Sequence, residues 1–141
     1  MKTGKKTALV VGANGVIGNN LIEYLEKSED WEIIGISRRP NIDRQKVRFI
    51  AVDLLDLADC IKKLGNLNTV THIYYVAYQD RSTWAELVEP NMKMLSHVLA
   101  AVEPIAPNIQ HISLMQGYKV YGAHLGPFKT PAKASDAGHM P

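Results

Sequence analysis

A glycine-rich turn between a short apolar segment and an amphipathic segment is the feature that most restricts how this 141-residue chain can fold. Glycine stands at every third position of the turn, as Gly12, Gly15 and Gly18. This spacing lets a strand turn sharply into a helix, lets the backbone approach a pyrophosphate, and lets the helix pack closely on the strand. The sequence therefore predicts a strand-turn-helix unit that binds a dinucleotide at the start of its helix. The alternative is a glycine-rich turn without a ligand.

The rest of the chain alternates between short β-branched blocks and longer segments with helical spacing. We expect five strands, each apolar enough to be covered on both faces, at residues 7–11, 32–36, 47–52, 72–77 and 109–114. The alternation predicts an α/β fold, a parallel, doubly wound NAD(P)-binding Rossmann sheet with strand order 3-2-1-4-5. Such sheets commonly have about six strands, so we expect the chain to be truncated before the substrate domain.

Two helices are expected between the first four strands. The first should bury one apolar face, formed by Ile17, Leu21, Tyr24 and Leu25. The second should begin after Asp56, whose side chain suits an N-cap, and should place Cys60 in the core. Gly65 should end it as a C′ residue.

The third expected helix begins near Ser82 or Thr83 and ends before Pro104. Pro90 has no backbone N–H, so we expect it to restart the helix at a first-turn position. From residue 122 onward the pattern of apolar residues fails, and no further helix or strand is expected. Residues 1–121 should therefore form the amino-terminal part of the Rossmann domain, and residues 122–141 a loop or disordered tail.

The residues after the second expected strand indicate which dinucleotide would bind. A fold that prefers NAD places an Asp or Glu about 20 residues past the glycine turn, to hold the ribose 2′-hydroxyl. This chain has Ser37, Arg38 and Arg39 instead. Guanidinium groups bind phosphate oxygens through paired, charge-assisted hydrogen bonds, so the sequence predicts NADP(H). The alternative is an arginine pair that is merely solvated on a loop.

Further candidate contacts follow from the rule that ligands of open α/β sheets bind at the carboxyl ends of the strands. The full expected set of cofactor-binding residues is Gly12, Asn14, Gly15, Val16, Ile17, Gly18, Ser37, Arg38, Arg39, Asp53, Leu54, Val76 and Ala77. Within this set, Asp53 could accept a hydrogen bond from an adenine amino group. It could equally serve only as a turn residue before the second helix.

Composition argues against several other classes of function. The chain has 16 Lys and Arg against 14 Asp and Glu, a balance too even to indicate a nucleic-acid or membrane surface. No segment approaches the roughly 18 apolar residues of a membrane span, and no signal peptide precedes the first strand. The single cysteine and five histidines show no metal-ligand spacing. We therefore expect a cytoplasmic protein without a metal site.

Several segments together resemble the atypical extended short-chain dehydrogenase/reductases, and among them the progesterone 5β-reductase and iridoid-synthase-like enone reductases. The resemblance covers nearly the whole chain. It rests on the glycine turn, Arg38-Arg39, Val52-Asp53-Leu54, residues 91–94 and residues 111–121. The glycine turn alone specifies only the superfamily, whereas the stretch from Gly117 through Lys119 to Tyr121 points to this branch.

The resemblance implies an enzyme that uses NADPH to reduce the carbon–carbon double bond of an enone by 1,4-addition of hydride. The family's catalytic lysine maps onto Lys119, although the spacing alone is equally compatible with a surface lysine in a turn. Ordinary members of the superfamily carry Ser or Thr at the position of Gly117, and a Tyr-x-x-x-Lys pair that this chain lacks. Both departures match the atypical branch. The family's catalytic tyrosine lies beyond the stretch that matches Pro141, so the chain is expected to be an amino-terminal fragment of a longer enzyme.

Two other functions remain open at this point. One is an NAD(P)-dependent sugar epimerase or dehydratase of the same superfamily, disfavoured by Gly117. The other is a non-catalytic NADP-binding sensor or scaffold that regulates a partner. A tyrosine in the downstream sequence would separate an enzyme from a sensor.

The expected partners are a small carbonyl or enone substrate and further copies of the chain. In a complete fold the strand at residues 109–114 would neighbour a sixth strand, so its outer edge should be bare and prone to pairing. Residues Met92, Leu95 and Leu99 offer a second surface, because extended short-chain enzymes often dimerise at this helix. The alternative is that the tail folds back and shields the strand edge.

Overall fold

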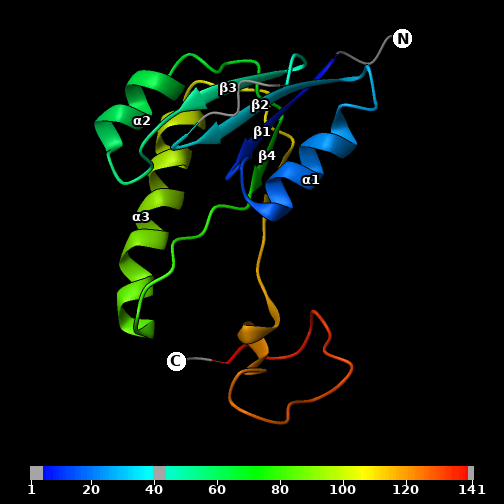
Figure 1. Ribbon diagram of the computed structural model, residues 1–141, viewed down its shortest axis with the longest axis vertical. Helices are drawn as coiled ribbons and strands as arrows, with labels where there is room; N and C mark the ends of the chain where they lie inside the picture. The colour runs from blue at the N-terminus through cyan, green and yellow to red at the C-terminus, as the bar shows by residue number, and fades with distance from the viewer. Residues whose placement is uncertain (1–4, 40–43, 140–141) are drawn as a thin grey trace.

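Five parallel strands form one sheet in the order β3-β2-β1-β4-β5, with helices on both faces (Figure 1). The strands are β1 (Lys6–Val11), β2 (Trp31–Ser37), β3 (Val47–Ala51), β4 (His72–Tyr75) and β5 (His111–Leu114). The helices are α1 (Val16–Leu25), α2 (Leu57–Leu64) and α3 (Trp84–Val102), with a 3₁₀ turn, η1 (Tyr118–Tyr121). This computed structural model describes residues 5–39 and 44–139. The strand order and fold class predicted from the sequence are confirmed.

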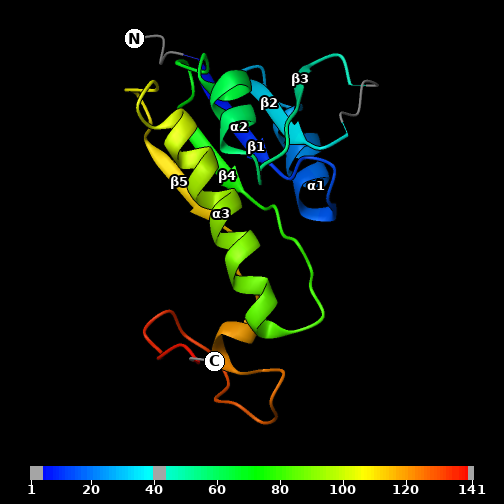
Figure 2. The same cartoon turned by 90° about the vertical axis from the view of Figure 1, so that its left-hand side faces the viewer.

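The central strand β1 divides the core into two layers. Its side chains alternate between the two faces of the sheet, and those of Ala8, Leu9, Val10 and Val11 are fully buried. Leu9 and Val11 join one apolar cluster, to which α2 and α3 contribute. Ala8 and Val10 join a second cluster, to which α1 contributes. Figure 2 shows α2 and α3 on the side of the sheet opposite α1.

Helix α1 buries only part of the expected face, with Leu25 buried and Leu21 packed against the core. Gly18, Ile22 and Leu25 are buried, whereas Ile17 and Tyr24 are 47% and 71% exposed. The cause is Gly18, because a Cβ built on it would lie 2.3 Å from the carbonyl oxygen of the turn before the helix. The helix rests on this glycine, so the residues four and seven positions later face the sheet. The expected burial of Ile17 and Tyr24 is wrong.

Helix α2 begins as predicted, with Asp56 as its N-cap, and Cys60 is fully buried as expected. Burial, with neighbouring carboxylates, raises the pKa of the Cys60 thiol to about 11. The helix ends at Leu64, but Gly65 is its C-cap with φ −67°, not a left-handed C′ residue. Glycine is required there for space, since an added Cβ would lie 2.4 Å from the carbonyl oxygen of Ile61.

Helix α3 begins after Thr83, which forms a reciprocal capping box with Glu86. The expectation that Pro90 restarts the helix is wrong, because the helix runs unbroken through it. Proline removes only the hydrogen bond to the carbonyl four residues earlier, on the exposed Glu86. The buried residues Met94 and Val98 in the following turns hold the helix on the sheet.

Strand β5 is the edge of the sheet and pairs only with β4 among the described strands. Ile112, Leu114 and Met115 at this edge are 39%, 46% and 51% exposed. Described residues 122–139 contain no helix or strand. Self-association at this edge stays a prediction. None of the helices in the described part of the chain is long and apolar enough to cross a membrane.

Replacing Asp56 with Ala should lower the free energy of unfolding by about 1 kcal/mol. The Asp56 side chain accepts hydrogen bonds from the backbone N–H groups of Ala58 and Asp59, at 2.9 and 3.2 Å. Asp56→Asn keeps an accepting oxygen and should retain most of the stability. Urea unfolding of both variants measures the difference, and an equal loss in the two would contradict the capping role.

Candidate functional site

An open cleft of about 670 Å³ lies at the carboxyl edge of the sheet, where β1, β2, β3 and β4 end. This is the edge at which ligands of open parallel sheets bind. The residues that line it are Gly12, Asn14, Gly15, Ile36, Ser37, Arg38, Arg39, Val52, Asp53, Leu54, Leu55, Val76, Ala77, Tyr78, Gln79 and Met94. The structure thus brings most of the expected cofactor-binding residues together in one place.

The glycine turn that lines this cleft has a backbone conformation that other residues rarely adopt. Gly12 has φ +94°, and a Cβ built on it would lie 2.8 Å from the backbone nitrogen of Ala77. The turn therefore brings the ends of β1 and β4 into direct contact. Gly15 is exposed and forms the N-cap of α1 without a side chain.

The amino end of α1 is the only uncapped one among the three described α-helices. Asp56 caps α2 and Thr83 caps α3 through their side chains, whereas no side chain caps α1. The first turn of α1 also contains no acidic residue. Its N–H groups and the positive end of its dipole are therefore available to an anion.

The turn after β2 carries two arginines that also line the cleft, next to the glycine turn. Arg38 and Arg39 are both exposed, and neither is ion-paired with another described residue. The Ser37 hydroxyl donates to the Arg39 carbonyl oxygen at 2.6 Å. The Asn14 side-chain amide donates to the same oxygen. The bond from Asn14 fixes the position of the arginine turn relative to the glycine turn.

Asp53 lies in the cleft but is also part of a local turn. Its carboxylate accepts from the backbone N–H of Leu55 at 3.0 Å, and its own N–H donates to Asp59 at 2.9 Å. The ion pair with Lys63, and then the N–H of Asp53, lower the pKa of the Asp59 carboxyl. Asp53 therefore has the expected role in a turn, whereas its contact with an adenine amino group stays a prediction.

Six lining residues were not in the expected set: Ile36, Val52, Leu55, Tyr78, Gln79 and Met94. All but Met94 lie at or shortly after the carboxyl end of a strand. The rule that ligands of open α/β sheets bind at these ends could therefore have predicted them as lining residues. Gln79 is held in place because the Asn91 side chain bonds its backbone N–H and carbonyl at 2.9 and 2.8 Å. Met94 comes from the buried face of α3, and no local sequence signal places it here.

Four expected site residues do not line the cleft: Val16, Ile17, Gly18 and Lys119. Val16 and Ile17 begin α1 with exposed side chains, and Gly18 packs against Gly12. Lys119 lies in η1, with its Nζ atom 4.9 Å from the centre of the Trp84 ring. Figure 1 shows η1 beyond the carboxyl edge of the sheet, near the amino end of α3.

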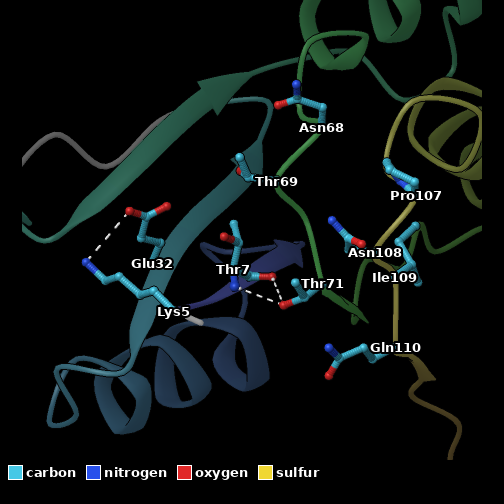
Figure 3. A pocket seen from close by; sticks show the side chains of 10 residues that line it. All are labelled: Lys5, Thr7, Glu32, Asn68, Thr69, Thr71, Pro107, Asn108, Ile109 and Gln110. Atoms are coloured by element: carbon cyan, nitrogen blue, oxygen red, sulfur yellow. Dashed lines mark hydrogen bonds and ion pairs between the residues drawn. The ribbon is translucent and has the colours of Figure 1, made fainter. Parts of the chain in front are cut away.

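A second hollow, of about 690 Å³, lies at the amino edge of the sheet (Figure 3). Lys5 and Glu32 form an ion pair at 3.7 Å on one side, and amide side chains such as Asn68 and Gln110 line another. The loops leading into it follow the carboxyl ends of α2 and α3, whose carbonyl groups disfavour anions. It lacks the glycine turn and the helix start that a dinucleotide phosphate needs. Among the described residues, no group of three or more His, Cys, Asp or Glu could hold a metal ion.

Comparison with known proteins gives concordant matches. The model of the NAD dependent epimerase/dehydratase family matches residues 8–138. The chain is 40% identical over 132 residues to the (S)-8-oxocitronellyl enol synthase ISY1 of Nepeta cataria. It is 39% identical over 132 residues to the 3-oxo-Delta(4,5)-steroid 5-beta-reductase of Arabidopsis thaliana. These matches cover 89% and 88% of this chain but 33% of each relative, so the chain spans about a third of their length.

The fold also matches solved structures. A short chain dehydrogenase from Burkholderia cenocepacia, solved in complex with NADP, superposes with a TM-score of 0.67 at 17% identity. The match covers 79% of this chain and 53% of that one. At this level of identity the likeness shows the shared fold alone.

Replacing Gly18 with Ala should lower the free energy of unfolding by about 1–3 kcal/mol, because the new methyl group meets backbone and α1 must move off β1. Gly117→Ala is the matched control, since a Cβ there has no neighbour within 4 Å and φ is −104°. Thermal unfolding of the two variants gives the comparison. Equal midpoints would show that Gly18 does not set the distance between α1 and β1.

Proposed function

This chain belongs to the NAD dependent epimerase/dehydratase family, and from that premise we propose that it binds NADP(H) as the cofactor-binding portion of a short-chain dehydrogenase/reductase. One observation carries the proposal. The uncapped amino end of α1 and the Arg38-Arg39 turn face one cleft at the carboxyl edge of the sheet. Two neighbouring groups that can each bind an anion match a ligand with phosphates at two positions.

The residues present fit such a ligand. The pyrophosphate would lie at the start of α1, where Gly15 leaves N–H groups uncovered. Arg38 and Arg39 would bind the 2′-phosphate, and their backbone is already held by Asn14 and Ser37. The adenine end would lie near Asp53 and Leu54. The nicotinamide half would pass Val76 and Ala77, the two residues that follow β4.

We further propose that the complete enzyme reduces an enone. The two relatives named above, an enol synthase and a steroid 5-beta-reductase, support this substrate class. Bound NADPH would supply a hydride to the β-carbon of the enone. The electron pair of the double bond would then shift through the conjugated system to the carbonyl oxygen, and a proton would later be added at the α-carbon.

Lys119 is the residue of this chain that we assign to that step. Its ammonium group would stabilise negative charge on the carbonyl oxygen, as a positioned cation does in a site from which water is excluded. Its Nζ atom lies 4.9 Å from the centre of the Trp84 ring, and this cation–π contact would help to hold the side chain in position. A sugar epimerase is disfavoured, since Gly117 has no hydroxyl where the superfamily's Ser or Thr would stand.

The chain should bind NADPH more tightly than NADH, because only NADPH offers Arg38 and Arg39 a 2′-phosphate. Arg38→Ala should lose one bidentate contact, which is worth about 1.5–3 kcal/mol, and should weaken NADPH binding by about tenfold or more. Isothermal titration of both nucleotides measures this. Arg48→Ala, on the exposed side of β3, is the control and should change neither affinity. Equal affinities of the unaltered chain for the two nucleotides would refute the assignment.

These 141 residues alone should not reduce an enone with NADPH, since the resemblance places the catalytic tyrosine outside them. A chain extended to the length of the relatives should do so. In that longer chain Lys119→Ala should lower kcat strongly while leaving NADPH affinity unchanged, because Lys119 does not line the cleft. NADPH consumption at saturating enone is the measurement. Robust turnover by the 141 residues would contradict the proposal.

A further inference from the structure

Arg44 joins two residues on the surface of α1 that lie seven positions apart. One terminal nitrogen of its guanidinium group forms an ion pair with the Glu26 carboxylate, at the C-cap of the helix. The other, Nη2, donates to the side-chain oxygen of Asn19 at 2.9 Å. Residues at this spacing share one face of a helix, so a single planar guanidinium group can bind both. We call these two bonds the Arg44 bridge.

The ion pair of the Arg44 bridge is sheltered from solvent. The Arg44 and Glu26 side chains are 21% and 19% exposed, whereas every other ion pair between described residues has a partner at least 39% exposed. Exposed ion pairs restrain their partners little, because water screens the charges and the side chains stay mobile. A sheltered pair with an additional hydrogen bond fixes the geometry of both partners. The bridge therefore holds the segment that leads into β3 against α1.

The Arg44 bridge is the second tether between the arginine turn and the unit formed by the glycine turn and α1. The first tether is the bond from the Asn14 amide to the Arg39 carbonyl oxygen. Arg44 follows Arg39 by only five residues in the sequence. The two tethers limit how far the arginine turn can move from the start of α1, where the pyrophosphate is proposed to bind.

We propose that Arg44 is a positioning residue for the 2′-phosphate of NADP(H), an inference that rests on the function proposed above. Arg44 does not line the cleft, and two of its terminal nitrogens are already bonded to Asn19 and Glu26. It acts by restraining the arginine turn before the ligand arrives, which lowers the entropy that binding must remove. NADH has no 2′-phosphate for this turn to bind, so the restraint favours NADPH alone.

Isothermal titration of the chain with NADPH and with NADH tests this role. Arg44→Ala should weaken NADPH binding by about fivefold and leave NADH binding within about twofold of the unaltered chain. Thermal unfolding of the variant shows whether it is folded at the temperature of the titration.

Glu26→Ala should also weaken NADPH binding by about fivefold, because it breaks the same ion pair. This result has a sign that charge alone would not give, since removing a carboxylate favours an anionic ligand. If Arg44 instead bound the phosphate directly, Glu26→Ala would release its guanidinium group and strengthen NADPH binding.

Lys46→Ala is the matched control. Lys46 stands two residues after Arg44 and pairs with Glu29, whose side chain is 91% exposed. The substitution removes one positive charge from the same segment and leaves both bonds of the Arg44 bridge in place. NADPH affinity should therefore stay within about twofold of that of the unaltered chain.

The outcomes separate this inference from the proposed function. An NADPH preference that Arg44→Ala and Glu26→Ala both retain would overturn the positioning role and leave the proposed function intact. So would stronger NADPH binding by Glu26→Ala, or an equal loss of affinity for both nucleotides in Arg44→Ala. Equal affinities of the unaltered chain for NADPH and NADH would refute the proposed function, and this inference with it.

Discussion

The contact between the glycine turn and the first turn of α1 decides how the rest of this structure is arranged. Gly12 and Gly18 meet so closely that a Cβ on Gly18 would lie 2.3 Å from a carbonyl oxygen. This contact holds α1 against β1 and selects Ile22 and Leu25 as its buried face. It also aims the start of the helix into the cleft at the carboxyl edge of the sheet. Packing and the proposed ligand binding therefore depend on the same two glycines.

The helix ends explain why the cleft, and not the second hollow, suits an anion. Asp56 and Thr83 satisfy the first N–H groups of α2 and α3, so those ends need no ligand. The start of α1 has no such side chain and opens beside Arg38 and Arg39. At the amino edge the loops follow helix carboxyl ends, where the dipole favours cations. The direction of the strands thus separates the edge at which we propose anion binding from the edge where the described loops follow helix carboxyl ends.

The sequence alone could predict every strand, because each is a short apolar run between turn residues. Their order is that of the doubly wound dinucleotide fold, which the glycine turn and the alternation of strands and helices indicate. It could also predict the caps, since Asp56 and Thr83 act through bonds to neighbouring residues. It could not predict the buried face of α1, because Ile17 and Tyr24 are apolar and only the contact at Gly18 orients the helix. It also could not predict that α3 continues through Pro90. The burial of Met94 and Val98 stabilises the helix more than the loss of one backbone hydrogen bond destabilises it. The bond from Asn14 to the Arg39 carbonyl and the position of Met94 in the cleft depend on tertiary structure, which no local pattern encodes.

Backbone amide NMR during titration with NADPH would test most directly whether the start of α1 and the arginine turn bind the same dinucleotide. We expect the amide signals of Val16, Ile17, Arg38 and Arg39 to shift together, with one common dissociation constant. The signals of Asn68 and Gln110, at the amino edge, should stay in place. Shifts confined to the amino edge, or different dissociation constants at α1 and at the arginine turn, would contradict a single dinucleotide site between them.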